Sequence, residues 1–477
     1  MTPKMDGLLH IRHRGAAPPH PLDSPLDSPL DSQRPDSPLD RQPPEAAPRV
    51  YVETFGCQMN EADSALIVGQ LRRNGYQSVS DPARADVILL NTCAVREKAE
   101  DRVYGRASQL LVHRRKNPDV VIGITGCMAE HLRDKLADTA PHIQLVAGPD
   151  SYRRIADLVD RARSGKPAFD VQLDKEETYS GLDGVRTDNG VSTFVSIQRG
   201  CDKFCTFCVV PYTRGRERGV PPDEVMRQVR IAAEAGYREV TLLGQTVNSY
   251  RWQDLSFAQL LRQVCRIDGI LRVRFTSPYP VDFSEEVIAA LAEEPKLCPY
   301  VHLPVQSGSD KLLASMKRGY TLSEFQTIVD TLRREIPDIA ISTDLMVGFC
   351  DETEFDHKQT LDLLRAVRFD SAFMFAYSDR AVTYASRKMN DNVPAEVKKR
   401  RLQEVIDLQE SFTRAGHHAQ VGRDQEVLIG GLSKRGDCLV GRTPRFHNAL
   451  LPLNAGRPGN LVSRRVTASS GHSLDTR

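Results

Sequence analysis

The sequence lacks the features that mark membrane, secreted or strongly charged proteins. None of its 477 residues lies in an uninterrupted apolar run of ~18 residues, the length that crosses a bilayer. The N-terminus has no apolar segment of the kind found in secretory signals. The formal net charge is only +1, so any surface for nucleic acid must be local. We therefore expect a cytoplasmic protein with no membrane association.

Cysteine, in contrast, is plentiful, with ten residues. Without a secretory signal these cysteines indicate a reducing compartment, where clustered thiols bind metals or catalyse reactions more often than they form disulfides. Cys265, Cys298, Cys350 and Cys438 have no partner at metal-binding spacing, and we interpret them as packing residues or free thiols. The other six fall into two sets of three.

Composition and periodicity divide the first part of the chain into three segments. Residues 1–48 hold 11 of the 29 prolines and the repeat "PLDSPLDSPLDS", so we predict a disordered extension that cannot bury enough apolar surface to fold. Residues 49–165 alternate short β-branched runs with helical stretches, which predicts an α/β domain with a parallel sheet. Residues 166–190 are polar, and we interpret them as a linker.

The second part repeats this alternation and then changes. Residues 191–417 contain six strand–helix units, beginning at "TFVSIQR" and ending after "SAFMFAYS", which predict a partial (β/α)6 barrel. Residues 418–477 are rich in glycine and short strands, which predicts a small β-barrel. The predicted fold class is therefore α/β with a small all-β domain at the C-terminus.

The first cysteine set lies in "RGCDKFCTFCVVPYTRGRE", which follows the first strand of the second series and contains Cys201, Cys205 and Cys208. A structural zinc site fills all four positions with protein ligands, whereas three thiolates suit an iron–sulfur cluster whose fourth iron binds another molecule. A zinc site with a distant fourth ligand, or three structural thiols, are the alternatives. Active sites of such barrels lie at the carboxyl ends of strands, so the position favours a catalytic role.

The second set places one cysteine after each of three strands in the N-terminal sheet. These are Cys57 in "TFGCQMN", Cys93 in "LNTCAVREKAE" and Cys127 in "ITGCMAE". The carboxyl ends of parallel strands meet at one edge of a sheet, so we expect these thiols to form a second metal centre with one open position. The alternative is three small buried residues, since free cysteine is often buried.

The C-x3-C-x2-C spacing, with Phe207 before the third cysteine, resembles the signature of the radical S-adenosylmethionine superfamily. From Arg49 to the end, the chain resembles the methylthiotransferase branch of that superfamily. The resemblance implies an N-terminal domain with an auxiliary 4Fe–4S cluster on Cys57, Cys93 and Cys127. It also implies a radical core with a 4Fe–4S cluster on the catalytic set of cysteines, and a C-terminal TRAM domain that binds RNA.

Within that family, the motifs "NTCAVREKAEDRVYG", "LLGQTVNSY" and "HLPVQSGSDKLLASMKRGYT" are most similar to members that modify tRNA. The resemblance implies that a methylthio group is added to C2 of an isopentenylated adenosine at position 37, beside the anticodon, with two molecules of S-adenosylmethionine used per turnover. The tRNA anticodon loop and an electron donor such as flavodoxin or ferredoxin are the expected partners of a monomeric enzyme, and a sulfur donor is a further candidate.

Three rival functions stay open at this point. The first two are sibling methylthiotransferases that act on threonylcarbamoyladenosine in tRNA or on an aspartate of ribosomal protein S12. The third is a non-catalytic RNA-binding iron–sulfur scaffold.

Four residues are candidate contacts for S-adenosylmethionine: Phe207, Gln245, Gln306 and Ser307. Gln245 ends the second core strand, where its amide oxygen could accept a hydrogen bond from the methionine amino group. Gln306 and Ser307 end the fourth strand. The family usually has Pro-Gly where this chain has Cys350 and Asp351, and Pro-Arg-Pro-Gly at 379–382, so we expect altered loop geometry there.

Basic residues mark two candidate contacts with RNA. Arg214, Arg216 and Arg218 follow the cluster loop and could meet phosphates or the cofactor carboxylate. Residues 418–477 hold nine Lys or Arg against four Asp or Glu, a local charge of +5 that suits RNA backbone binding. Arg442 and Arg445 are the candidates within its motif "GRTPRFHNALLP".

Overall fold

The computed structural model describes residues 47–94, 97–132, 142–184 and 190–477. The proline-rich extension expected at 1–48 lies outside these residues except for Ala47 and Pro48. Among the helices within the described ranges, none combines the length and apolarity needed to span a membrane.

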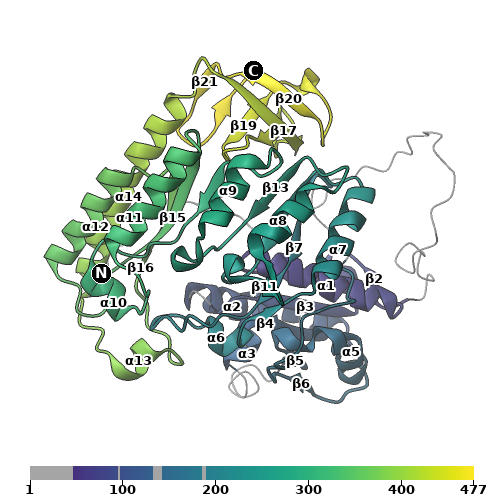
Figure 1. Ribbon diagram of the computed structural model, residues 1–477. Helices are drawn as coiled ribbons and strands as arrows, with labels where there is room; N and C mark the ends of the chain where they lie inside the picture. The colour runs from purple at the N-terminus through teal and green to yellow at the C-terminus, as the bar shows by residue number, and fades with distance from the viewer. Residues whose placement is uncertain (1–46, 95–96, 133–141, 185–189) are drawn as a thin grey trace, which may run out of the picture.

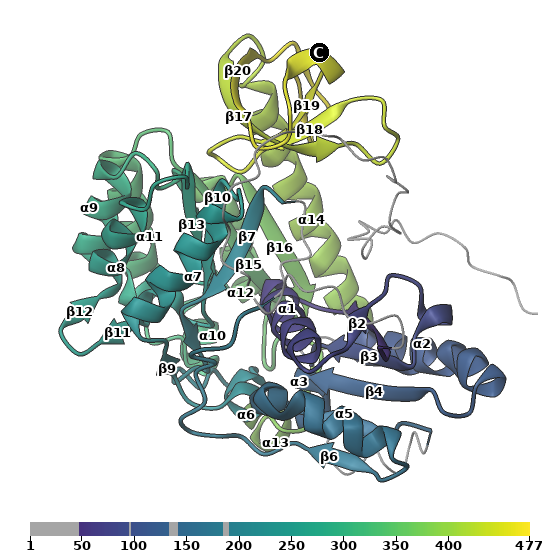
Figure 2. The same ribbon diagram turned by 90° about the vertical axis from the view of Figure 1, so that its right-hand side faces the viewer.

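The N-terminal domain is a six-stranded parallel sheet covered by helices on both faces (Figure 2). Alternate residues of its central strand β3 (Val87–Thr92) pack into separate apolar clusters, one with α1 (Gln58–Arg73) and α5 (Ile155–Arg163), the other with α2 (Glu97–Lys116). Burial on both faces explains the nearly continuous apolar strands. The remaining strands are β2 (Gln77–Ser78), β1 (Arg49–Thr54), β4 (Val121–Gly126), β5 (Leu145–Ala147) and β6 (Ala168–Asp170), in the order β2-β1-β3-β4-β5-β6.

The segment 166–190, expected to be a linker, is partly built into this domain. Strand β6 pairs with β5 at the edge of the sheet, and Tyr179 and Leu182 are buried in the cluster that contains α1. The polar composition of the segment does not predict this packing, because only a few apolar side chains anchor the segment.

The core domain contains the six expected parallel strands, in the chain order of an open barrel (Figure 1). They form two sheets, β13-β10-β7 and β14-β15-β16, linked by a bridge between Val273 and Leu297. No pairing between β7 and β16 closes the barrel among the described residues. The strands are β7 (Ser192–Ser196), β10 (Glu239–Leu243), β13 (Arg272–Phe275), β14 (Tyr300–His302), β15 (Ala340–Val347) and β16 (Ser371–Ala376).

Helices follow the strands and bury one large apolar cluster against them. They are α7 (Pro222–Glu234), α8 (Phe257–Cys265), α9 (Glu285–Glu293), α10 (Asp310–Ser315), α11 (Leu322–Glu335), α12 (Glu354–Val367), α13 (Tyr384–Lys388) and α14 (Ala395–His418). Two short elements flank the first cysteine loop. One is the β8–β9 pair (Gln198–Arg199 with Arg218–Gly219), and the other is α6 (Val210–Arg214).

The C-terminal domain, expected as a small β-barrel, is a curled six-stranded sheet. Its longest strand, β17 (Asp424–Leu432), changes register between Ile429 and Gly431, and such bulges increase strand twist. The order is β20-β17-β18-β19-β22-β21, with β18 (Leu439–Arg442), β19 (Asn448–Leu451), β20 (Leu461–Arg465), β21 (Ala468–Ser469) and β22 (Leu474–Asp475).

The C-terminal sheet docks on the amino ends of the core strands, whereas the N-terminal domain lies at the other end of the core (Figure 1). Arg274 of β13 donates hydrogen bonds to the carbonyls of Thr443 (2.9 Å) and Pro444 (2.8 Å). The ring of Phe446 stacks on Tyr300 with 4.7 Å between centroids. The loop between β18 and β19 is therefore the docking element.

Replacing Phe446 by Ala should loosen this docking, because the aromatic stack with Tyr300 is worth about 1 kcal/mol beyond its area. We expect faster proteolysis between α14 and β17, with the other two domains unaffected. Leu432→Ala is the control, since that side chain is 62% exposed in the same domain. Equal cleavage of the two variants would contradict the assignment.

Candidate active site

The loop that carries Cys201, Cys205 and Cys208 is held by backbone hydrogen bonds from three directions. The N–H of Cys201 donates to the carbonyl of Gly215 at 3.1 Å. Thr206 donates to the carbonyl of Met316 and accepts from the N–H of Ala385 at 2.8 Å. Segments after β14 and β16 thus fix the loop that follows β8.

Burial dominates the acidity of this set. Desolvation, with a smaller effect from the charge of Cys205, raises the pKa of Cys201 to about 11 and that of Cys208 to about 12. Binding of a metal must displace the protons of these two thiols. Cys201 and Cys208 therefore have the chemistry of metal ligands rather than of free nucleophiles.

A buried cation lies against this set. Nη1 of Arg318 is 3.3 Å from the sulfur of Cys205, and its guanidinium lies over the rings of Tyr279 (4.7 Å) and Tyr320 (5.4 Å). Its Nη2 donates to the carbonyl of Pro304 at 2.9 Å. The sequence pattern did not indicate Arg318, because "KRGYT" is typical of a charged turn and its partners are distant in the chain.

The structure places the second set at one edge of the N-terminal sheet. Cys57 follows β1, Cys93 follows β3 and Cys127 begins α3 (Cys127–Leu132) after β4, and these three strands are neighbours. A hydrogen bond from Cys93, followed by the charge of Arg214, lowers the pKa of Cys57 to about 6.

The local backbone allows little change around this second set. Gly56 has a φ of +137°, and a Cβ there would lie 2.6 Å from the Cβ of Cys93. Cys57 is exposed, whereas Cys93 and Cys127 are buried. Burial raises the pKa of Cys127.

The segment after the first cysteine set packs against the second set at the interface between the N-terminal domain and the core, where α3 and α6 lie side by side (Figure 2). Val209, next to Cys208, packs against Cys127. At the end of α6, Nε of Arg214 donates to the sulfur of Cys127 at 3.1 Å. A single five-residue helix therefore connects the loop of one set to the ligands of the other.

The charges beside both sets suit iron–sulfur clusters. Arg318 lies against the sulfur of Cys205, and Arg214 lies against the sulfur of Cys127. Three thiolates with a cation beside them match an anionic cluster with an open iron.

The candidate contacts for S-adenosylmethionine have different structural surroundings. Oε1 of Gln245 is buried with no hydrogen-bond partner among the described residues, which leaves an acceptor for a ligand. Gln306 has a φ of +74° and its backbone bridges β15, accepting from Met346 at 2.8 Å. Phe207 packs edge-on against Phe349 at 6.3 Å.

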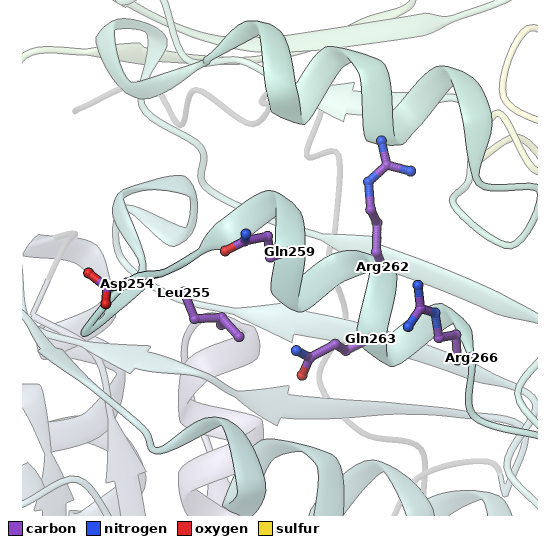
Figure 3. Close-up of a pocket in the computed structure, with 6 residues that line it drawn as sticks. All are labelled: Asp254, Leu255, Gln259, Arg262, Gln263 and Arg266. Atoms are coloured by element: carbon purple, nitrogen blue, oxygen red, sulfur yellow. The ribbon is translucent and has the colours of Figure 1, made fainter.

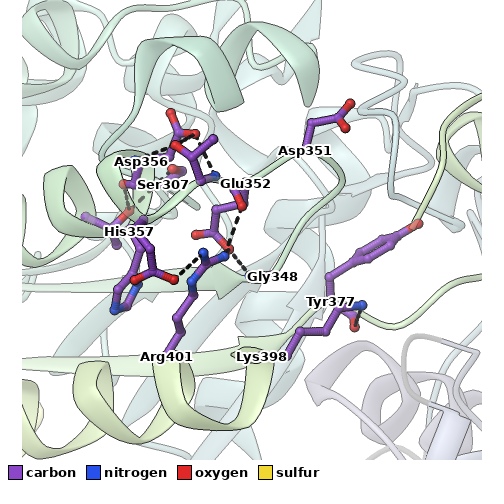
Figure 4. A network of polar contacts seen from close by, with 12 residues as sticks. Ser307, Gly348, Asp351, Glu352, Asp356, His357, Tyr377, Lys398 and Arg401 are labelled. Atoms are coloured by element: carbon purple, nitrogen blue, oxygen red, sulfur yellow. Dashed lines mark hydrogen bonds and ion pairs between the residues drawn. The ribbon is translucent and has the colours of Figure 1, made fainter. Parts of the chain in front are cut away.

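Ser307 belongs to a polar network that braces α12 and α14 (Figure 4). Its hydroxyl lies 3.4 Å from that of Thr360 and accepts from the N–H of Ser309 at 3.2 Å. In the same network, the buried Glu352 pairs with the buried Arg401 at 3.0 Å. Ser307 therefore has a structural use that its sequence position did not indicate.

One of the two departures from the family pattern lies in a turn. Asp351 stands where glycine is usual and has a φ of +60°, the left-handed region that Asp tolerates better than most residues. Its N–H donates to Oδ1 of Asn392 at 2.9 Å, and Nδ2 of Asn392 donates back at 2.6 Å.

The arginines after the cluster loop require a correction. Arg214 and Arg218 were candidates for phosphate or cofactor contacts, but both are buried against carboxylates of the N-terminal domain. Arg216 is 67% exposed and pairs with Asp202. In the C-terminal domain, Arg445 pairs with Asp370 of the core at 2.9 Å and helps to dock the domain.

A shallow surface hollow elsewhere in the core involves none of these residues. It lies beside α8 and the hairpin of β11 (Arg251–Trp252) and β12 (Leu255–Ser256). The lining residues are Asp254, Leu255, Gln259, Arg262, Gln263 and Arg266 (Figure 3). It contains no candidate site residue.

Known proteins resemble the chain over most of its length. Residues 49–148 match the Uncharacterized protein family UPF0004, and residues 195–364 match the Radical SAM superfamily. A protein of Chloroherpeton thalassium named tRNA-2-methylthio-N(6)-dimethylallyladenosine synthase is 44% identical over 429 residues, 89% of this chain and 95% of that protein. A protein of the same name from Porphyromonas gingivalis is 43% identical, over 89% of this chain and 94% of its own.

Solved structures support the fold. The radical S-adenosylmethionine methyltransferase TsrM from Kitasatospora setae gives a TM-score of 0.55 at 14% identity, covering 71% of this chain and 74% of that one. At this identity the likeness concerns the fold alone.

Gly200→Ala should prevent loading of the cluster on the first cysteine set. The residue has a φ of +76°, and a Cβ would lie 1.9 Å from the carbonyl oxygen of Arg216. We expect about half of the wild-type iron after anaerobic reconstitution, because the second set is untouched. Gly165→Ala is the matched control, with a φ of +79° and nothing within 4 Å of its Cβ. Full iron content in Gly200→Ala would refute the geometry.

Proposed function

The chain belongs to the family of tRNA-2-methylthio-N(6)-dimethylallyladenosine synthases, and we propose that it adds a methylthio group to C2 of N6-isopentenyladenosine at position 37 of tRNA. The observation that carries this proposal is the meeting of two three-cysteine sets at one interface. Relatives of this name match about nine-tenths of the chain, so action on threonylcarbamoyladenosine or on ribosomal protein S12 is not favoured. A scaffold without turnover would not need two clusters with open irons.

The C2–H bond of adenine is not acidic enough for removal by a side-chain base, so a radical route is required. When bound, the cluster of Cys201, Cys205 and Cys208 would supply the electron that cleaves S-adenosylmethionine, and the auxiliary cluster of the second set would supply a site for the sulfur. The residues of this chain hold and orient these groups. The unpaired amide oxygen of Gln245 suits the amino group of the methionine.

Arg318 has a separate task in this proposal. Its positive charge stabilises the anionic ligand set at Cys205, and its two tyrosine neighbours exclude water from that side. Phe207 and Phe349 fill the opposite side of the loop.

Binding of tRNA is assigned to two separated parts of the protein. The anticodon loop must reach the cysteine sets, whereas the basic C-terminal domain is docked at the far end of the core. Five of its basic side chains are exposed and unused in docking: Arg423, Lys434, Arg435, Arg457 and Arg465.

We also propose a cytoplasmic monomer that receives electrons from flavodoxin or ferredoxin, with the sulfur coming from the auxiliary cluster or a separate donor.

Replacing Cys57, Cys93 and Cys127 together by Ala should separate the two activities. We expect release of 5′-deoxyadenosine from S-adenosylmethionine to persist, because the first ligand set is unchanged, while methylthiolated tRNA falls below detection by mass spectrometry of nucleosides. The complementary control replaces Cys201, Cys205 and Cys208, which should abolish both products. Normal methylthiolation in the first variant would show that the auxiliary site is misassigned.

Changing Arg423, Lys434 and Arg435 to Gln should weaken tRNA binding and reduce its salt dependence. For every phosphate that the protein no longer neutralises, the slope of log K against log salt becomes shallower by about 0.7–0.9. Filter binding at several salt concentrations measures this slope. Arg477→Gln is the control, since that side chain is already paired with Asp475. An unchanged slope in the triple variant would show that these three side chains do not bind RNA phosphates.

A further inference from the structure

At the interface between the N-terminal domain and the core, three buried arginines share two buried aspartates. Asp150 accepts ion pairs from Arg199 (3.2 Å) and Arg218 (2.9 Å), and Asp63 pairs with Arg214 at 2.7 Å. These five side chains are all 7% exposed or less. Three guanidinium groups from the core therefore face two carboxylates from the N-terminal domain.

Several N–H groups of these arginines lack acceptors. Among the described residues, Nε and Nη1 of Arg199, Nη1 of Arg214 and Nε of Arg218 are buried without a hydrogen-bond partner. Burial lowers the pKa of Arg199 to about 10, and its guanidinium lies 3.4 Å from the ring centre of Tyr179. A buried, unpaired cationic donor is costly, so this arrangement needs a further anion.

The position of Arg214 identifies where that anion belongs. One edge of its guanidinium faces Asp63, while Nε faces the sulfur of Cys127 at 3.1 Å. The negative charges of three thiolates exceed the positive charge of an oxidised 4Fe–4S core, so a cluster on Cys57, Cys93 and Cys127 is anionic. Reduction increases its negative charge.

We propose that Arg214, backed by Arg199 and Arg218, is a positioning residue that balances the charge of the auxiliary cluster and holds the N-terminal domain more tightly to the core when the cluster is loaded. This inference rests on the proposed function in one respect, the assignment of Cys57, Cys93 and Cys127 as cluster ligands. It goes beyond that function because it makes assembly of the cluster the step that completes the domain interface.

Two physical consequences follow. Removing the cation at 214 leaves the reduced cluster, which has the greater negative charge, less stabilised than the oxidised one, so the reduction potential must fall. Without the cluster, the three arginines repel one another and share the carboxylates of Asp63 and Asp150, so the interface should open more often.

The first experiment uses the full chain with Cys201→Ala, Cys205→Ala and Cys208→Ala, which leaves only the auxiliary cluster. In this background, Arg214→Gln is compared with Arg214→Lys and with Arg216→Gln, the exposed arginine two residues along. We measure bound iron and the midpoint potential by redox titration followed by electron paramagnetic resonance. Arg214→Gln should show a more negative potential or a loss of iron, whereas Arg216→Gln should match the background and Arg214→Lys should lie between.

The second experiment measures hydrogen exchange in the wild-type chain before and after reconstitution. Loading should slow exchange in α1 and α6, and this protection should shrink in Arg214→Gln. If the background holds iron and Arg214→Gln matches Arg216→Gln in potential, iron and protection, this proposal is overturned and the proposed function stands. If the background holds no iron, the ligand assignment falls, and this proposal falls with it.

Discussion

The buried ion pair between Arg214 and Asp63 fixes the carboxyl edge of one parallel sheet against the carboxyl edge of another. Parallel strands deliver their loops to a common edge, and each sheet here delivers three cysteines there. The Arg214–Asp63 ion pair brings the two edges together, because it joins the loop after Cys208 to helix α1, which follows Cys57. The two ion pairs of Asp150 lie at the same interface.

The sequence predicted the parts of this arrangement that depend on local pattern. Alternating β-branched runs and helices predicted both parallel sheets, and the position of each cysteine after a strand predicted that Cys57, Cys93 and Cys127 would meet. Arg318 was not singled out and Arg214 was assigned to phosphate or cofactor, because the sulfurs they contact are more than 80 positions away and a charged side chain in a sequence is normally exposed. The described part of the expected linker, residues 166–184, shows a related limit: a few buried anchors such as Tyr179 decide its place, and composition averages them out.

The C-terminal domain uses part of its positive charge inside the protein. Its motif "GRTPRFHNALLP" supplies the docking loop, with Phe446 against Tyr300 and Arg445 against Asp370, so Arg445 binds the core. The domain is docked at the amino ends of the core strands, whereas the cysteine loops follow strands at the opposite end. The length of the core strands therefore separates these two regions.

The open barrel has a consequence for how the two larger domains are joined. Since β7 and β16 are not paired with each other in the described structure, the edge of β7 is left for another part of the chain. Helix α1 of the N-terminal domain packs against β7 there, with Met59 beside Ser196. A strand that closed the barrel would compete for that edge, so the missing strand pair lets a helix of one domain cover the sheet of the other.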